Sequence, residues 1–273
     1  MKVQGKVWVV TGGGSGMGRD LVVALLQRGA RVAAVDVRVD ALAETVAEAG
    51  GGERLSTHTA DITDVDTVRA LVADVVTAHG CVDGLVNNAG IIQPFDPVAQ
   101  LSDQALHRVI DVNLMGTINV TRAFLPVLID RPEAHLANVS SMGGFFPFPG
   151  QTIYGASKAA VKLFTEGLYA ELLDSSVRVS VIMPGAVATG ITENSGVEMP
   201  GGAAAASQSR IPQTQPADAA RIMIEGIEKN KLHIYVGKDA RFMNLAIRIA
   251  PRRAIEMVQK QMAKMMTPKE PVR

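Results

Sequence analysis

Short apolar runs alternate with segments of helical periodicity along most of this chain. Such alternation is typical of repeated β-α-β units, because a parallel strand can be reached only through a crossover connection. Several runs are nearly continuous Val, Ala and Ile, which favours strands covered on both faces. The predicted strands are 6–11, 31–36, 54–59, 82–87, 134–140, 177–183 and 232–236, and the predicted helices are 16–28, 40–48, 64–79, 102–129, 152–175 and 216–229. We therefore expect an α/β protein built on one parallel sheet.

The 273 residues suffice for one large domain and would crowd two. We assign 1–237 to this domain, including a loop at 190–215 that is rich in Gly, Ala, Ser and Gln. We assign 238–273 to a helical, amphipathic and basic extension. Nine basic and three acidic residues give this extension a net charge of +6, so the rest of the chain carries −6.

The composition argues against several classes of protein. Lys and Arg together number 27, as do Asp and Glu, so the basic excess of a typical nucleic-acid-binding protein is absent. Cys81 is the single cysteine, which excludes an internal disulfide, and no Cys/His cluster suggests a metal site. No run of about 18 apolar residues predicts a transmembrane helix, and no signal peptide precedes the first strand. We expect a cytoplasmic protein that binds neither nucleic acid nor metal.

A glycine-rich turn, Thr11-Gly12-Gly13-Gly14-Ser15-Gly16-Met17-Gly18, joins the first predicted strand to the first predicted helix. Glycines permit positive φ and close approach of a ligand to the backbone, and the helix N-terminus behind them offers free N–H groups to a pyrophosphate. The spacing T-G-x-x-x-G-x-G differs from the common dinucleotide pattern G-x-G-x-x-G. The turn still favours dinucleotide binding over a tight turn without a ligand.

Asp36 ends the second predicted strand, 18 positions after Gly18. A carboxylate there accepts hydrogen bonds from ribose hydroxyls and repels a 2′-phosphate, which favours NAD. Alternatively, Asp36 only caps the next helix. Arg38 is an argument for NADP, because a guanidinium suits a 2′-phosphate, but Ser15 stands where a basic residue of the turn would support that choice. The sequence favours NAD.

Tyr154 and Lys158 are four residues apart in a predicted helix, so their side chains share a face. Free tyrosine has a pKa of about 10, and a nearby cation favours its phenolate. Ser141 lies 13 residues upstream, at the carboxyl end of a predicted strand, where an open α/β sheet presents its ligand-binding groups. Taken alone, a Tyr and a Lys at this spacing are usually surface residues.

These motifs occur in order with Asn87-Asn88-Ala89-Gly90, Asn113 and Pro184-Gly185, and together they resemble the short-chain dehydrogenase/reductase family over about residues 5–190. The resemblance implies a single-domain Rossmann-type doubly wound parallel sheet, about seven strands in the order 3-2-1-4-5-6-7 with helices on both faces. It also implies an oxidoreductase that exchanges a hydride between a nicotinamide cofactor and an alcohol or ketone.

The resemblance also implies roles for individual residues. Tyr154 would exchange a proton with the substrate oxygen, Ser141 would orient that oxygen, and Lys158 would hold the nicotinamide ribose and lower the pKa of Tyr154. Asn113 would support a water in a proton relay. The implied cofactor-binding residues are Thr11, Gly12, Gly14, Ser15, Gly16, Met17, Gly18, Asp36, Asp61, Ile62, Asn88, Ala89, Gly90, Tyr154, Lys158, Pro184, Gly185, Val187 and Thr189. Among them, Asp61 would bind the adenine amino group, and Val187 and Thr189 would bind the carboxamide.

In this family the substrate pocket follows the fifth strand and the Pro-Gly pair. The segment 142–148 is rich in Phe although only 4% of the chain is aromatic, and the loop at 192–212 contains no Lys. A pocket formed by Met142, Phe145, Phe146 and Met199 with Ser141 favours an apolar alcohol or ketone, unless the phenylalanines are core residues.

The extension at 238–273 departs from the commoner family pattern, which ends soon after the last strand. Its apolar and basic residues could contact a membrane surface, or they could cover the body or a partner subunit. We expect a homodimer through the helices at 102–129 and 152–175, or a homotetramer. Two alternative functions stay open. One is a non-catalytic NAD-binding regulatory protein on the same fold, although all of Asn113, Ser141, Tyr154 and Lys158 are present. The other is a peripheral-membrane dehydrogenase of a lipid, steroid or retinoid.

Overall fold

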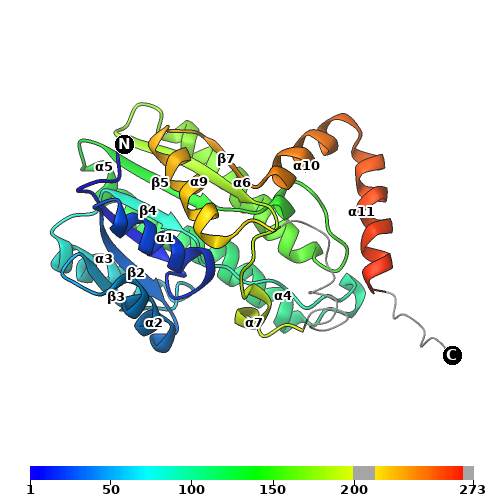
Figure 1. The fold of residues 1–273 in the computed structure, drawn as a ribbon, viewed down its shortest axis with the longest axis horizontal. Coiled ribbons are helices and arrows are strands. Elements are labelled where there is room, and N and C mark those ends of the chain that lie inside the picture. Colours follow the sequence, from blue (N-terminus) through cyan, green and yellow to red (C-terminus); the bar gives the residue numbers. More distant parts are fainter. Residues whose placement is uncertain (199–212, 267–273) are drawn as a thin grey trace.

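A computed structural model describes residues 1–198 and 213–266 of the chain as one α/β domain around a seven-stranded parallel sheet (Figure 1). The strands follow the order β3-β2-β1-β4-β5-β6-β7, which confirms the predicted topology. Their bounds are β1 (Val7–Thr11), β2 (Arg31–Asp36), β3 (Leu55–Thr59), β4 (Gly84–Asn87), β5 (Ala134–Val139), β6 (Val177–Pro184) and β7 (His233–Val236). Because the order reverses between β1 and β4, the carboxyl ends of these strands border a crevice suited to a ligand.

Helices cover both faces of the sheet (Figure 1). The helices are α1 (Gly16–Gln27), α2 (Val39–Ala49), α3 (Val65–His79), α4 (Asp103–Ile110), α5 (Thr117–Ile129), α6 (Thr152–Glu171), α7 (Ile191–Ser195), α9 (Pro216–Glu228), α10 (Lys238–Ile249) and α11 (Pro251–Met266). Three short segments complete the fold: η1 (Val98–Gln100), η2 (Asp111–Gly116) and η3 (Met142–Gly144). The pleat of β1 explains the two cores, since Trp8 packs with residues of α1 and α9 while Val9 packs with residues of α3, α5 and α6.

The predicted helix 102–129 is divided by the π-helical segment η2. Asn113, in η2, is fully buried, and its amide both accepts from the Ile91 N–H (2.8 Å) and donates to the Ile91 carbonyl (2.9 Å). π-bulges of this kind occur mostly at functional sites. The wider turn therefore coincides with a side chain that holds the segment after β4.

The continuous run Asp103–Ile129 is the one helix in the described part of the chain that is long and apolar enough to cross a membrane by length and composition. Polar and charged residues interrupt this run, so the sequence does not predict a membrane-spanning helix there. Val120, Phe124 and Leu128 in this run are fully buried in the core with β4 and β5 residues, so the helix packs as part of the domain.

The extension forms α10 and α11, at the end of the molecule remote from β3 (Figure 1). Ala254 and Val258 of α11 are buried against Phe146, in a cluster that also includes Met243 and Ile247 of α10. The basic extension is therefore helical, as predicted, through Met266. Of the predicted loop 190–215, α7 is a short helix, and Val187 pairs with Thr214 in an isolated bridge.

Candidate active site

The glycine turn brings the amino end of α1 against the carboxyl ends of β1 and β4. Gly12 has φ +65°, and a Cβ there would lie 2.9 Å from the Ala89 Cα. A Cβ on Gly18 would collide with the Gly12 carbonyl oxygen. Glycine is therefore required at both positions, and the turn leaves the helix N-terminus open toward the crevice.

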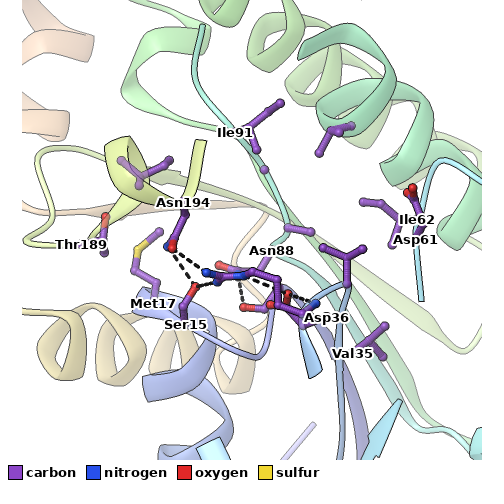
Figure 2. A pocket seen from close by; sticks show the side chains of 18 of the residues that line it. Ser15, Met17, Val35, Asp36, Asp61, Ile62, Asn88, Ile91, Thr189 and Asn194 are labelled. Atoms are coloured by element: carbon purple, nitrogen blue, oxygen red, sulfur yellow. Dashed lines mark hydrogen bonds and ion pairs between the residues drawn. The ribbon is translucent and has the colours of Figure 1, made fainter. Parts of the chain in front are cut away.

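A cavity of about 430 Å³ opens along this turn (Figure 2). Most of the predicted cofactor-binding residues line it: Gly12, Ser15, Gly16, Met17, Asp36, Asp61, Ile62, Asn88, Ala89, Gly90 and Thr189. The glycines keep the cavity open, since a Cβ on Gly16 would lie 3.3 Å from the Thr189 side chain. One wall is apolar, with Val35, Ile62 and Val112, as an adenine ring requires, and the other holds the helix N-terminus that suits a pyrophosphate. The residues present therefore fit a dinucleotide.

Asp36 is nearly buried at the end of β2, and its carboxylate accepts two backbone hydrogen bonds. The Gly14 N–H donates to Oδ2 (3.0 Å) and the Arg38 N–H donates to Oδ1 (3.1 Å). Asp36 therefore braces the glycine turn as well as facing the cavity. The alternative of a purely local capping role does not account for the contact with Gly14, which lies 22 residues away.

The Arg38 guanidinium connects three segments at the cavity wall. It donates to the Ser15 hydroxyl (2.8 Å) and to the Asn194 side-chain oxygen (2.9 Å), and its Nε lies 3.7 Å from Asp36 Oδ1. Asn194 in turn donates to Ser15 (3.1 Å). The dashed lines at Ser15, Asn194 and Asp36 in Figure 2 mark the hydrogen bonds and ion pairs of this group. A positive charge thus lies beside the carboxylate that was expected to select NAD.

Eight predicted cofactor-binding residues do not line the cavity: Thr11, Gly14, Gly18, Tyr154, Lys158, Pro184, Gly185 and Val187. The Thr11 hydroxyl, at the end of β1, accepts hydrogen bonds from the N–H groups of Asn88 (3.0 Å) and Ala89 (3.1 Å). Asp239 at the start of α10 accepts from the Ala186 N–H (2.7 Å), which fixes the segment after β6. These residues position the binding groups through the backbone.

Tyr154, Ser141 and Lys158 come together at the carboxyl end of β5. Tyr154 and Lys158 share one face of α6, and Ser141 caps η3 by accepting from the Gly143 N–H (3.0 Å). The Ser141 hydroxyl lies beside the Tyr154 ring, because a Cβ on Gly143 would lie 3.2 Å from Tyr154 Cε1 and 3.4 Å from Ser141 Oγ. The three residues therefore form one cluster, as the resemblance implies.

The Lys158 ammonium connects this cluster to the cavity. It is nearly buried and donates to the Val139 carbonyl (3.1 Å). A Cβ on Gly90, which lines the cavity, would lie 2.9 Å from Lys158 Nζ and 3.1 Å from Asn113 Oδ1. Asn113 also donates to the Ser157 hydroxyl (3.0 Å), which anchors η2 to α6. All four predicted catalytic residues thus lie together.

Burial controls the proton affinities of this cluster. Burial raises the pKa of Tyr154 above its usual value of 10, and the neighbouring Ser141 hydroxyl opposes that rise. Burial also lowers the pKa of Lys158 from 10.5 to about 8. Without a cofactor, the direction for Tyr154 is opposite to the lowering that the resemblance implies, because desolvation of the phenolate is the larger effect.

The predicted substrate-binding residues differ in their burial and in their distance from solvent. Met142 and Phe145 are half-buried next to Ser141, whereas Phe146 is fully buried and packs against Phe148, with ring centroids 5.6 Å apart. Phe146 is thus a core residue under the extension, so its side chain does not line an open pocket here. Met199 lies outside the described residues.

Gln93 was not anticipated from the sequence. Its fully buried side-chain oxygen accepts from the N–H groups of Ile153 (2.7 Å) and Tyr154 (2.9 Å) at the start of α6. Asn194 and Arg108, which line the cavity, were also missed. These contacts join residues 60 to 179 positions apart, and no local pattern signals them.

Known proteins share this fold and sequence. The family profile described as short chain dehydrogenase matches residues 6–199. A putative oxidoreductase SadH of Mycobacterium tuberculosis is 36% identical over 253 residues, spanning 90% of this chain and 91% of that protein. A short-chain dehydrogenase/reductase of Burkholderia phymatum, solved with NAD, superposes with a TM-score of 0.81 at 27% identity, covering 100% and 99% of the two chains. A Burkholderia cenocepacia short chain dehydrogenase, solved with NADP, gives 0.78 at 29% identity over 98% and 100%.

Proposed function

Because the chain belongs to the short-chain dehydrogenase/reductase family, we propose that this oxidoreductase interconverts a hydrophobic secondary alcohol and its ketone, with NAD as cofactor. The observation that carries the proposal is the Tyr154, Ser141 and Lys158 cluster beside the cavity that Gly90 lines. A bound nicotinamide supplies hydride exchange, which no side chain can perform.

The cluster supports acid/base chemistry at the substrate oxygen. Tyr154 holds a proton that it can donate to a carbonyl oxygen, since burial raises the pKa of its phenol. Ser141 is placed to orient the same oxygen because its hydroxyl and the Tyr154 ring both lie against Gly143. In the oxidative direction Tyr154 must lose its proton, and the Lys158 charge on the same helix face favours the phenolate. Gln93 fixes the backbone from which the phenol projects.

Asp36 supports NAD as the cofactor. A ribose 2′-phosphate would approach a nearly buried carboxylate, and like charges repel strongly where water is scarce. Arg38 offers partial compensation, but its guanidinium is already shared between Ser15 and Asn194. We therefore infer preference for NAD rather than exclusion of NADP.

An apolar substrate is supported by the surroundings of Ser141. Met142 and Phe145 pack in one cluster with Met243, Ile247 and Met262 of the extension. An apolar molecule gains free energy against such a wall, whereas a phosphorylated or acidic one would lose hydration there.

Three further proposals concern the domain bounds, the cellular location and the oligomeric state. We propose a main domain at 1–237 with an extension at 238–273, and a cytoplasmic location. We propose a homodimer through α4, α5 and α6, or a homotetramer, because Leu163, Tyr169 and Leu173 expose apolar area on α6 and just beyond it.

The test compares wild type with Tyr154→Phe and with Tyr169→Phe, an exposed tyrosine of the same helix. Nicotinamide absorbance is followed with NAD and NADP against apolar secondary alcohols and, in reverse, ketones. We expect turnover by wild type and Tyr169→Phe, loss of turnover in Tyr154→Phe, and NAD binding by all three. Binding without turnover across the panel would contradict the proposal and favour a non-catalytic NAD-binding protein. Turnover of charged substrates alone would contradict the apolar class.

A further inference from the structure

Helix α10 has apolar side chains on two adjoining faces, one packed on the body and one exposed. On the inner face, Met243, Ala246 and Ile247 pack against the segment that follows Ser141. On the outer face, Phe242, Leu245 and Ile249 are 60%, 57% and 74% exposed. These three residues follow the i, i+3, i+7 spacing of one helical stripe. The stripe, defined by Phe242, Leu245 and Ile249, is covered by nothing in the described part of the chain.

Cations border this stripe. Arg241 and Arg248 are exposed on α10, one at four positions and one at three positions from Leu245, which places them beside it. On α10 Asp239 is the one acidic residue against three basic ones, and Glu256 of α11 is paired with Arg252 (2.9 Å). The stripe therefore lies in a positive surround, while the chain outside the extension carries a net charge of −6.

We propose that the outer face of α10 docks on an anionic phospholipid bilayer. The stripe offers three side chains on a helix about 18 Å long, much less than the roughly 800 Å² per partner of a stable protein interface. It does match interfacial binding, in which apolar side chains enter the boundary of the acyl chains and cations meet lipid phosphates. Each cation near such a surface raises binding by about fivefold.

The opposite net charges of the body and the extension would orient the docked molecule. An anionic surface attracts the extension, which includes α10, and repels the rest, so the extension faces the bilayer. The inner face of α10 packs on Met142 and Phe145, next to Ser141. Docking would thus bring the apolar wall of the site near the lipid, where an apolar substrate concentrates. Docking itself does not depend on the proposed reaction.

The test uses the full chain and co-sedimentation with vesicles of phosphatidylcholine, with or without phosphatidylglycerol. We expect binding only to the anionic vesicles, weakened by salt. Leu245→Glu should lower the partition coefficient by more than about tenfold. Arg241→Glu changes only a solvent-exposed charge and should lower it by about 25-fold, the loss of two charge steps. Val65→Glu, an exposed apolar residue on α3, is the matched control and should bind like wild type.

Turnover of a water-soluble ketone should be unchanged in all three variants, which separates failed docking from failed catalysis. Equal vesicle binding by wild type, Leu245→Glu and Arg241→Glu would overturn the proposal. So would the absence of binding to anionic vesicles. If Leu245→Glu instead shifts the chain to a smaller species in size-exclusion chromatography and wild type ignores vesicles, the stripe is a subunit interface and the proposal is wrong.

Discussion

Replacing Gln93 with methionine tests whether a buried amide positions the catalytic helix. Its Oε1 accepts from the N–H groups of Ile153 (2.7 Å) and Tyr154 (2.9 Å), two of the donors that a helix start leaves without intrahelical partners. Its Nε2 has no partner among the described residues, so the acceptor carries the interaction. Gln93→Met keeps the volume and removes the acceptor.

The magnitude follows from those two bonds. A buried N–H left without a partner costs roughly 1–3 kcal/mol, so the pair costs about 2–6 kcal/mol. For a chain of this size, Tm falls by roughly 2–4 °C per kcal/mol, which predicts a decrease of at least about 4 °C. Tyr154 carries one of these N–H groups, and a displacement of its phenol by about 1 Å lowers kcat by up to about 100-fold.

The assay combines thermal unfolding with kcat and KM for NAD. We expect Gln93→Met to lower Tm and kcat while KM for NAD stays near wild type, because Gln93 does not line the cofactor cavity. Gln93→Glu keeps an acceptor for both N–H groups and should recover part of kcat. Gln27→Met, at an exposed position on α1, is the control. A Gln93→Met protein with unchanged Tm and kcat would refute the reasoning.

Three further predictions concern the cofactor and the cluster. Burial lowers the pKa of Lys158 to about 8, so above that pH the folded chain releases a proton that the unfolded chain keeps. The free energy of unfolding therefore rises by at most about 3 kcal/mol between about pH 8 and 10.5. Urea unfolding of Lys158→Met should lack this rise. Asp36→Asn keeps an acceptor for the Gly14 N–H but removes the charge, so KM for NADP should fall about tenfold. An unchanged ratio of the KM values for NADP and NAD would show that the charge does not select the cofactor. Gly18→Ala places a Cβ against the Gly12 carbonyl, and calorimetry should show loss of NAD binding, while Gly167→Ala on α6, where a Cβ meets nothing within 4 Å, should bind normally.

Hydrophobic periodicity, together with the glycine and proline residues between segments, was enough to predict most of the strands of the sheet. The strands 31–36 and 177–183 are rich in Val, Ala and Ile, and the structure places β2 and β6 there, with β6 one residue longer. The cofactor turn could be predicted because two constraints lie within it: Gly12 has positive φ, and a Cβ on Gly18 would meet the Gly12 carbonyl oxygen. Features that depend on short segments could therefore be predicted from the sequence.

Features that depend on contacts between residues far apart in the sequence could not be predicted. The π-helical segment η2 accompanies a bond between Asn113 and the backbone of Ile91, 22 residues away. Phe146 has the composition of a pocket residue, but α11 covers it and makes it part of the core. Gln93 is a lone glutamine in a loop, and only the fold shows that it meets the start of α6.

The Arg38 guanidinium described at the cavity wall has a thermodynamic consequence. It is shared between Ser15 on the cofactor turn and Asn194 on α7, so the free energies that order these two segments are linked. A ligand that attracts this guanidinium would weaken its bond to α7, and whatever holds α7 in place would in turn alter the affinity of that ligand by the same factor. The choice of dinucleotide and the ordering of the chain beyond β6 are therefore coupled equilibria rather than independent properties.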